Sequence, residues 1–380
     1  MDIQEMREEL NQIDLEMVQL FAKRMDTIAR ISKHKIENNL PVLDSERELE
    51  VLNHVVEISG NKMETYTKRL FNTLLELSKS YQNQLFSHNS QLAQDIKAAT
   101  CELTRQFPYK ANVACQGTEG SYSQQACEKL FPLPNPMFFL DFDSVFQAVE
   151  KGMCEYGLLP VENSLAGTVI TVYDLMEKHK FHIVRSIRLR INHVLVAKKG
   201  VALDDIKEII SHEQAISQCS GFLKANPQIK VTVFSNTATA AKYVAESNRS
   251  DLAAISSETC AELYNLDILT HNIQNRDNNY TRFICISKEM RIYPGANKIS
   301  ILLSLPHKPG SLCTLLSKFS SLGLNLTKLE SRPIIGKDFE FMFYFDFDAS
   351  IYLPETVNLL CELENSLSKF IFLGSYSEIF

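Results

Sequence analysis

The sequence predicts a multidomain chain with three successive fold classes: an all-α segment, an α/β domain and a smaller α+β domain. Residues 2–37 contain neither Pro nor Gly and carry apolar side chains at helical spacing. From residue 111, short β-rich runs alternate with helical runs, which indicates an α/β domain with a largely parallel sheet. After residue 295, the order becomes strand, helix, strand, strand, helix, strand. A length of 380 residues is consistent with two to three domains.

The composition narrows the class of protein. With 45% hydrophobic and 22% charged residues, the chain is expected to fold around a sizeable core. A net charge of −7 argues against nucleic acid or a membrane surface as partner, although a local basic cluster can still bind an anionic substrate. The sequence shows no secretory signal and no apolar run near the ~18 residues that span a membrane. Nine cysteines without a C-x-x-C pair and nine histidines without metal-binding spacing predict reduced thiols and no metal, hence a cytoplasmic enzyme or sensor.

The N-terminal segment predicts three helices. The first covers residues 2–37 and carries a coiled-coil-like apolar seam. The second begins with a capping box formed by Ser45 and Glu48 and stops before Gly60. The third follows and continues into the eighties or nineties, where a polar linker at 91–110 begins. Three such helices cannot easily bury the seam alone, so we expect a helical dimer.

Cationic side chains lie on or near this seam. Arg24 occupies the heptad position of Ile3 and Leu10, where an unpaired charge is costly. Lys35 follows ~20° around the helix axis and ~16 Å along it, so both cations lean toward a common space. Arg7 lies ~100° off that face and would more naturally reach a site on a partner chain. Each of these residues alone could be a charge on the solvated surface of a helical bundle. Together, the residues favour a site that binds an anion. Polar residues that complete the pattern are Asp44, Arg47, Glu48, Ser80 and Gln84.

With these eight side chains, residues 1–90 resemble the all-helical chorismate mutase domain, an intertwined dimer. The resemblance implies the unimolecular rearrangement of chorismate to prephenate, which requires a folded substrate and a donor to the ether oxygen but no nucleophile. By the same resemblance, the side chains that hold the two carboxylates are Arg7 of the partner subunit, Arg24, Arg47 and Ser80. The donors to the ether oxygen are Lys35 and Gln84, and the residues at the ring hydroxyl are Asp44 and Glu48.

Polar motifs follow several strands of the α/β domain. A glycine-rich turn at 117–123 separates a strand from a helix, where backbone N–H groups can approach an anion. Glu162-Asn163-Ser164 and Ser211-His212 each end a strand, the place where ligands bind in open α/β folds. Gln218 lies about two turns beyond the second motif, and Thr281-Arg282-Phe283 precedes an apolar strand. An ordinary turn, or a loop whose polar groups are hydrogen-bonded within the protein, explains each motif alone. Only the motifs taken together indicate a binding site.

Residues 111–290, which carry these motifs, resemble prephenate dehydratase. The family fold is two α/β lobes around a cleft, similar to type II periplasmic binding proteins. The implied reaction takes prephenate to phenylpyruvate, CO2 and water without a cofactor. Thr281 would donate to the leaving hydroxyl, and a neighbour must polarise it because a free threonine is a weak acid. Arg282 would be either a carboxylate partner or structural support. The implied substrate-positioning residues are Glu162, Asn163, Ser164, Ser211 and Gln218.

Residues 298–380 follow the order of the ferredoxin-like fold. Two tetrapeptides, at 309–312 and 330–333, resemble the markers of the ACT regulatory domain, with Ser311 where the family usually has Ala. The resemblance implies a phenylalanine pocket at a dimer interface. Its effector-binding residues would be Gly310, Ser311, Leu312, Glu330, Ser331, Arg332 and Pro333.

The three resemblances together cover essentially the whole chain and imply consecutive steps of one pathway. The expected protein is a bifunctional enzyme of phenylalanine biosynthesis, inhibited by phenylalanine and assembled as a homodimer or larger. One alternative is a dehydratase whose N-terminal helices only dimerise, against which the eight matching side chains count. The other is a non-catalytic binding protein that senses an amino acid, which the presence of Thr281 disfavours.

Overall fold

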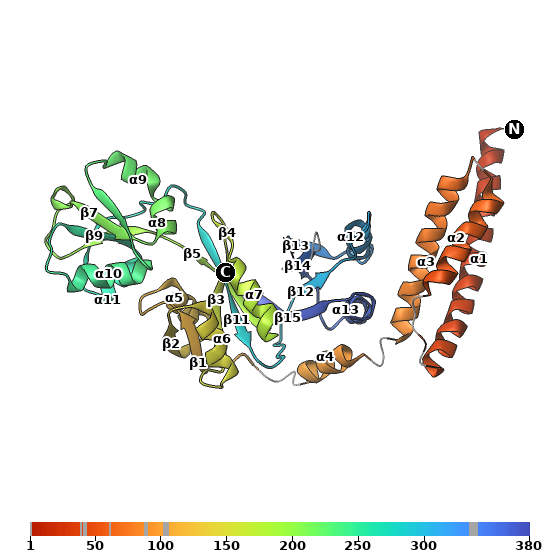
Figure 1. The fold of residues 1–380 in the computed structure, drawn as a ribbon, viewed down its shortest axis with the longest axis horizontal. Coiled ribbons are helices and arrows are strands. Elements are labelled where there is room, and N and C mark those ends of the chain that lie inside the picture. The colour runs from red at the N-terminus through yellow and green to blue at the C-terminus, as the bar shows by residue number, and fades with distance from the viewer. Residues whose placement is uncertain are drawn as a thin grey trace. The chain divides into compact units, whose positions relative to one another are not determined.

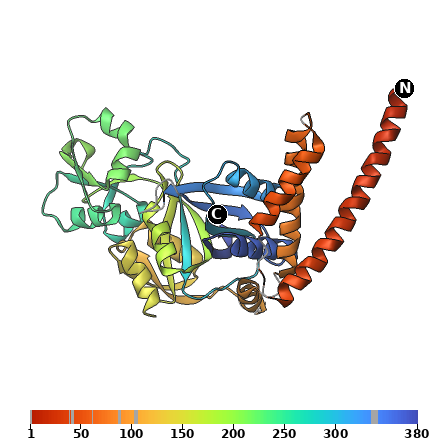
Figure 2. The ribbon, with the colours of Figure 1, turned by 45° about the vertical axis from the view of Figure 1, so that its right-hand side comes forward.

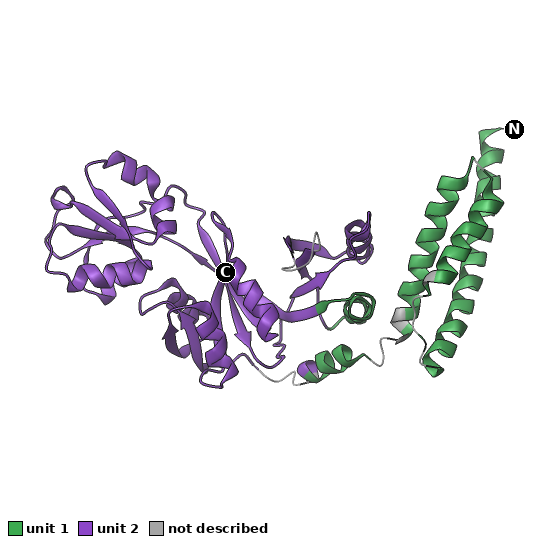
Figure 3. Cartoon of the chain, in the orientation of Figure 1, with its two compact units in different colours: residues 1–98, 352–370 green, residues 99–351, 371–380 purple. Residues whose placement is uncertain are grey.

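The computed structural model describes residues 2–38, 40, 44–60, 62–86, 90–101, 106–333 and 341–380. Figure 1 shows the elements of the chain, which forms two compact units coloured separately in Figure 3. Unit 1 contains residues 1–98 and 352–370, and unit 2 contains residues 99–351 and 371–380. The segment 352–370 therefore belongs with the N-terminal helices rather than with its neighbours in sequence.

Unit 1 is helical, which confirms the all-α prediction for the N-terminal segment. Its helices are α1 (Ile3–Glu37), α2 (Ser45–Ser59), α3 (Glu64–Phe86), most of α4 (Gln91–Cys101) and α13 (Pro354–Ser366). α3 contacts α1, α2 and α13. It therefore lies at the centre of the unit.

The start of α2 differs from the prediction. The N-cap is Asp44, whose carboxylate accepts a hydrogen bond from the N–H of Arg47 at 3.1 Å. Ser45 is the first helical residue, and Glu48 pairs with Lys79 of α3, with 3.2 Å between Nζ and Oε1. The predicted capping box of Ser45 and Glu48 is therefore wrong. Asp is as good an N-cap as Ser, and the sequence pattern did not distinguish them.

The apolar seam of α1 is left in water within a single chain. Ile3 is 58%, Leu10 58% and Met17 50% exposed. α1 is the long red helix that starts at the N-terminus in Figure 2. Large apolar side chains spaced along one helix face require a partner surface, because burying them is the main source of helix stability in proteins.

Unit 2 contains two sheets. The larger has ten strands in the order β13-β14-β12-β15-β5-β11-β3-β1-β2, with β4 paired to β3. Its strands are β1 (Lys110–Gln116), β2 (Leu133–Phe139), β3 (Tyr156–Asn163), β4 (Gly167–Thr168), β5 (His182–Arg190), β11 (Tyr280–Ser287), β12 (Lys298–Ser304), β13 (Asn325–Pro333), β14 (Phe341–Asp348) and β15 (Phe370–Ile379).

The smaller sheet has five strands in the order β10-β6-β9-β7-β8. Its strands are β6 (Val194–Ala197), β7 (Glu208–Ser211), β8 (Lys230–Val233), β9 (Leu252–Ser256) and β10 (Asp267–Thr270). The helices of unit 2 are α5 (Tyr122–Leu130), α6 (Phe142–Glu150), α7 (Ile170–His179), α8 (Glu213–Gln218), α9 (Ser220–Ala225), α10 (Thr237–Glu246), α11 (Glu258–Leu263) and α12 (Ser311–Ser321). This alternation confirms the α/β prediction.

Both sheets are mixed, whereas the sequence pattern predicts a largely parallel sheet. β1 pairs in parallel with β2 and β3, but β11 runs antiparallel to both β3 and β5. The cause is the chain path, since β11 returns from the small sheet to the large one. Two segments therefore cross between the sheets, one before β6 and one after β10. They bond to each other, with the N–H of Ile191 donating to the carbonyl of Asn279 at 2.8 Å and that of Ile273 to His193 at 3.2 Å.

The C-terminal strands extend the large sheet. β15 pairs in parallel with β5, with Ser377 opposite Arg185 and Ile379 opposite Ile187. Met342 and Tyr344 of β14 share a hydrophobic cluster with side chains of β3, α6 and α7. The last strands are thus part of the same packed body as the α/β strands, which sequence reasoning treated as a separate domain.

Candidate functional sites

Thr281 and Asn163 face each other on neighbouring strands. The two residues are register partners in β11 and β3. Nδ2 of Asn163 lies 3.0 Å from Oγ1 of Thr281 and donates a hydrogen bond to it. The hydroxyl oxygen of Thr281 therefore acts as an acceptor toward Asn163, which leaves its own hydrogen available to a second group.

The amide of Asn163 has one orientation. Its Oδ1 accepts from the N–H groups of Leu165 at 3.0 Å and Ala166 at 2.9 Å, so the NH2 group must be the side that meets Thr281. Asn163 is 5% exposed. A buried amide held by backbone donors gives Thr281 a fixed neighbour.

A chain of buried side chains extends from Asn163. Its Nδ2 also donates to Oδ1 of Asn279 at 2.9 Å, and Nδ2 of Asn279 donates to Oε1 of Gln218 at 2.9 Å. Oε1 of Gln218 lies 2.9 Å from Nε2 of His193. The structure thus brings the predicted residues Asn163, Gln218 and Thr281 together, with Gln218 in a supporting position behind Asn163.

Two other predicted residues hold loops. Ser164 donates its hydroxyl to the carbonyl of Asn278 at 2.8 Å and accepts from the N–H of Tyr280 at 3.0 Å. Ser211 is fully buried, and its hydroxyl donates to the carbonyl of Ile255 at 2.7 Å. These bonds occupy both hydroxyl groups within the protein.

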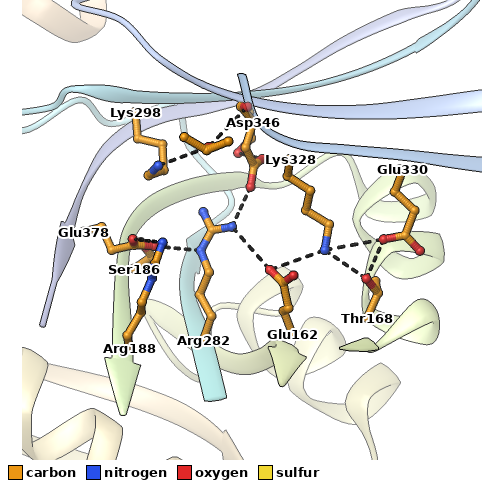
Figure 4. Close-up of polar contacts among 12 residues, drawn as sticks. Glu162, Thr168, Ser186, Arg188, Arg282, Lys298, Lys328, Glu330, Asp346 and Glu378 are labelled. Carbon is orange, nitrogen blue, oxygen red and sulfur yellow. Dashed lines mark hydrogen bonds and ion pairs between the residues drawn. The ribbon is translucent and has the colours of Figure 1, made fainter. Parts of the chain in front are cut away.

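Glu162 points away from Thr281. Adjacent residues of a strand face opposite sides, so Glu162 lies on the face opposite Asn163. There its Oε2 lies 3.4 Å from Nζ of Lys328 and 4.0 Å from Nη1 of Arg282, as Figure 4 shows. The structure therefore does not place Glu162 beside the Thr281 hydroxyl.

Arg282 is held by carboxylates of its own chain. Its Nη1 lies 2.5 Å from Oδ2 of Asp346, and its Nε lies 2.8 Å from Oε1 of Glu378 (Figure 4). Its Nη2 donates to the hydroxyl of Tyr376 at 2.7 Å. Although burial alone would lower the pKa of Arg282, the charges of Tyr376 and Asp346 raise it. Of the two roles left open for Arg282, this geometry favours structural support.

Thr168 belongs to the same polar network. It lies in β4, and α7 begins two residues later. Its hydroxyl donates to Glu330 of β13 and accepts from Nζ of Lys328 at 2.9 Å (Figure 4). Side chains of the strands after 298 thus meet the α/β strands through ion pairs and hydrogen bonds.

In unit 1, Arg24 turns toward α3. Its Nη1 donates to the carbonyl of Leu74 at 3.2 Å and to the hydroxyl of Ser78. Partial burial lowers the pKa of Arg24. The cation is therefore seated between α1 and α3, on the inner side of the bundle.

The other residues predicted for this site are dispersed within one chain. Arg7 is exposed, and Arg47 pairs with Glu50 of its own helix at 2.9 Å. Lys35 is half-buried near the end of α1. The hydroxyl of Ser80 donates to Oε2 of Glu362 in α13 at 3.0 Å. Gln84 lies in α3, but its side chain is outside the described residues.

The C-terminal segment contains a cavity of about 370 Å³ beside the start of α12. Gly310, with φ +88°, is the N-cap of this helix, and it opens the turn that forms one wall. The lining residues are Leu305, Pro306, His307, Lys308, Pro309, Ser311, Leu312, Phe341 and Phe343. Ser311 and Leu312 therefore lie where the sequence predicts an effector pocket.

The second predicted effector motif is divided between two faces of β13. Ser331 is opposite Phe343, so its side chain shares the face of a residue that lines the cavity. Glu330 and Arg332 face the other way. Glu330 meets Lys328 at 3.4 Å, and Arg332 lies 3.4 Å from Asp174. The exposed Pro333 ends the strand. Within one chain, Glu330 and Arg332 do not line the cavity.

Several residues of these networks escaped sequence reasoning. Asn279 is fully buried but stands in the polar stretch before Thr281, and only its burial distinguishes it from a loop asparagine. His193 lies directly before β6. Tyr122 lies in the glycine-rich turn, and its hydroxyl donates to the carbonyl of Asn192 at 2.6 Å. The one feature of the sequence that could have indicated His193 is its position as a polar residue directly before an apolar strand.

Two further observations concern metal ions and membranes. Among the residues that the structure describes, three or more His, Cys, Asp or Glu side chains do not gather at a point where a metal ion could bind. Within the same residues, every helix is too short or too polar to cross a membrane.

Comparisons with known proteins agree with this arrangement. Residues 6–83 match the family model for chorismate mutase type II, and residues 113–291 match the model for prephenate dehydratase. A bifunctional chorismate mutase/prephenate dehydratase from Buchnera aphidicola subsp. Schizaphis graminum is 32% identical over 390 residues, which cover 99% of this chain and 96% of the relative. An arogenate dehydratase/prephenate dehydratase of Arabidopsis thaliana is 38% identical over 70% of this chain and 73% of its own length.

A solved structure matches a large part of the chain. It is a prephenate dehydratase from Arthrobacter aurescens in complex with L-Phe, with 28% sequence identity and a TM-score of 0.64. The match covers 70% of this chain and 89% of that one. Because the Buchnera relative is aligned over nearly the whole of both chains, this chain belongs to the family of bifunctional chorismate mutase/prephenate dehydratases.

Proposed function

We propose that the chain converts chorismate to prephenate at residues of its N-terminal helices and prephenate to phenylpyruvate at Thr281, under inhibition by phenylalanine. The observation that carries the second activity is the hydrogen bond from Nδ2 of Asn163 to Oγ1 of Thr281. It holds the threonine oxygen as an acceptor, so its hydrogen points to the substrate. This is the polarising neighbour that a weak acid such as threonine requires.

In the dehydratase step, the ring C–O bond and the bond to the ring carboxylate break together. The electrons of the C–CO2 bond enter the ring, CO2 leaves, and the hydroxyl departs with the electrons of the C–O bond. The hydrogen bond from Thr281 stabilises the charge that grows on this oxygen, which leaves as water after it gains a proton. Ser164 and Ser211 hold the loops around the site, and Gln218 supports Asn163.

In the mutase step, the protein folds the substrate and stabilises charge on the ether oxygen. Arg24 is seated between α1 and α3, where its fork can hold a carboxylate. Lys35 lies on the same helix and is assigned to the ether oxygen with Gln84. Asp44, Arg47, Glu48 and Ser80 complete the site in this proposal, and Arg7 of the partner subunit enters it from the second chain.

The assembly is proposed to be a homodimer built on α1. The exposed seam at Ile3, Leu10 and Met17 fits a second copy of the same helix. We expect sedimentation of the wild-type protein to give twice the mass of one chain, and Leu10→Lys with Met17→Lys to give one. A monomeric wild-type protein with full mutase activity would contradict the proposal. A cytoplasmic location stays a prediction.

The C-terminal segment is proposed to be an ACT domain with a ferredoxin-like fold. Its elements follow the order β12-α12-β13-β14-α13-β15, and its strands have the order β13-β14-β12-β15. The Arthrobacter relative was solved with L-Phe. The cavity of about 370 Å³ lined by Ser311 and Leu312 is the proposed phenylalanine pocket.

The deciding experiment measures absorbance changes of the purified chain with chorismate and with prephenate, each with and without phenylalanine. We expect chorismate loss, phenylpyruvate formation and inhibition of the second reaction. If prephenate reacts and chorismate does not, the N-terminal helices only dimerise. If neither reacts in a folded protein that binds prephenate, the chain is a binding protein. Arogenate is the comparison substrate, because the Arabidopsis relative carries that name as well.

A further inference from the structure

His193 is a buried histidine without an assigned task. It is 2% exposed, and its ring lies between Tyr122 and Gln218. The main-chain N–H of His193 donates to Oε1 of Gln274 at 3.0 Å. It stands on the first of the two crossing segments, and Asn279 stands on the second. The imidazole is therefore placed where the two lobes of the dehydratase region are joined.

The hydrogen-bond directions along the buried chain can be derived from one end. Backbone N–H groups fix Oδ1 of Asn163, so its Nδ2 is the donor to Oδ1 of Asn279. Asn279 then offers Nδ2 to Oε1 of Gln218. Since Oε1 can only accept, the group that faces it at 2.9 Å, Nε2 of His193, must carry a hydrogen. The ring is thus the Nε2–H tautomer.

Burial also favours the neutral form of the ring. Burial lowers the pKa of His193, although the hydrogen bond to Gln218 raises it in part. Tyr122 uses its hydrogen on the carbonyl of Asn192, and its oxygen lies 3.4 Å from Nδ1 of His193. The two rings meet edge-on with centroids 6.0 Å apart. The imidazole therefore has one tautomer and one orientation.

We propose that His193 is a positioning residue of the dehydratase, which acts through Gln218 and Asn279 to hold Asn163 against Thr281. The inference rests on the proposed dehydratase function. Oε1 of Gln218 accepts from two side-chain donors, Nε2 of His193 on the first crossing segment and Nδ2 of Asn279 on the second. Without the imidazole, the amide of Gln218 keeps only its bonds to Asn279 at 2.9 Å and Asn163 at 3.4 Å, so the acceptor that orients Asn279 is held less firmly.

The consequence should appear in turnover rather than in substrate affinity. Thr281 still meets substrate in a variant without the imidazole, but its hydrogen is no longer held toward the leaving oxygen. A misplacement of about 1 Å in such a group costs on the order of 10²-fold in rate. We therefore expect His193→Phe, which keeps a planar ring beside Tyr122, to lower kcat by about 10²-fold and leave KM for prephenate nearly unchanged.

The first experiment compares three variants of the full chain. His193→Gln keeps an N–H donor near the position of Nε2 and should recover most of kcat. His179→Phe removes another buried imidazole, which stacks on Phe146, and should keep wild-type kcat. Chorismate turnover in the same samples reports whether each preparation is active. Wild-type kcat in His193→Phe, or an equal loss in His193→Gln, overturns the inference.

A second experiment separates positioning from a general loss of packing. Asn279→Leu breaks the same chain one step closer to Thr281, so adding His193→Phe to it should cost little more. If the fold-losses in kcat of the two single variants multiply in the double variant, His193 acts by another route than through Asn279. For a variant that fails to fold, the ¹⁵N spectrum of histidine in the wild-type chain remains a test, because a ring protonated at Nδ1 instead of Nε2 contradicts the derived direction. If wild-type protein does not convert prephenate at all, the proposed function fails and not this inference alone.

Discussion

Nη1 of Arg282 lies 2.5 Å from Oδ2 of Asp346, in an ion pair whose side chains are 9% and 3% exposed. Arg282 directly follows Thr281, yet its guanidinium faces the strands after 298 (Figure 4). Neighbouring positions of β11 thus serve two tasks: one side chain faces the proposed reaction and the next holds the C-terminal strands to the sheet.

Arg282→Ala is expected to destabilise unit 2 by about 3–5 kcal/mol, because it leaves Asp346 buried without its cation and removes one of the two cations beside Glu378. The urea midpoint for loss of dehydratase activity would measure this, with mutase activity of the same chain as reference. Arg188→Ala is the matched control, since Arg188 also pairs with Glu378 but is 44% exposed, and should cost about 0–1 kcal/mol. Equal midpoints for Arg282→Ala and wild type would contradict the structural role.

Asn163→Asp should impair the dehydratase without removing any side chain from the site. The new carboxylate can only accept, so Thr281 would turn its hydrogen toward it and away from substrate. We expect kcat to fall by about 10²–10³-fold, as for loss of one donor to a developing oxyanion. The exposed Asn135, changed to Asp, is the control. Unaltered kcat for prephenate would show that Thr281 does not depend on Asn163.

Lys35→Ala should abolish most chorismate turnover and leave prephenate turnover intact. The loss of a cationic donor to the ether oxygen is expected to cost about 10²–10³-fold. Lys33→Ala, an exposed lysine two residues earlier on α1, controls for the change in charge. Both activities are measured on one preparation. Loss of both reactions in a folded Lys35→Ala protein would argue against separate sites.

Glu208 is expected to stabilise the small sheet only above acidic pH. Hydrogen bonds from Thr232 at 2.6 Å and from Arg249 and Lys230 lower the pKa of Glu208 to about 2. Because the pKa of Glu208 is lower in the folded than in the unfolded protein, its contribution to stability is fully present above about pH 4.5. This contribution is lost as the pH falls toward 2. Glu208→Gln should therefore lower Tm at pH 7. The difference in Tm between this variant and the wild-type protein should shrink as the pH is lowered.

The exposed Glu246, which lies 3.8 Å from Lys242, is the control for this measurement. Glu246→Gln should leave Tm unchanged at both pH values, because an exposed pair of this kind contributes little. A Glu208→Gln difference that persists unchanged in acid would contradict the assigned cause.

Gly310→Ala should weaken inhibition by phenylalanine and spare basal turnover. A β-carbon at Gly310 would meet nothing within 4 Å, so the cost is that of the left-handed backbone at φ +88°, about 1–2 kcal/mol. The turn that forms one wall of the cavity would shift to relieve it. Gly323→Ala, at φ +66° beyond the other end of α12, carries similar strain outside the cavity. Equal inhibition constants for the two variants would contradict the assignment of Gly310 to the phenylalanine pocket.

The sequence predicted the elements better than their arrangement. Helical spacing and the absence of Pro and Gly delimited α1 to within a residue at each end. Strand direction is not encoded in apolar pattern, so the antiparallel β11 was missed. Its direction depends on the chain returning from the small sheet.

The candidate sites show the same division. Motifs identified Asn163, Gln218 and Thr281, which the fold brings together. The motifs did not reveal that Glu162 and Glu330 face a polar network on the other side of their strands. Alternation along a strand predicts that it has two faces, but it does not predict which face the substrate occupies. His193 and Asn279 could not be found from pattern alone, since their task depends on contacts between two distant crossing segments.

The polypeptide enters unit 1 twice, first with residues 1–98 and again with residues 352–370. A gene split at a single point therefore cannot divide the protein along the boundary between its units. Release of the N-terminal unit as an independent product would require two further breaks near residues 351 and 370, which would take α13 from the C-terminal segment. In the intact chain, α13 contacts α3 within unit 1.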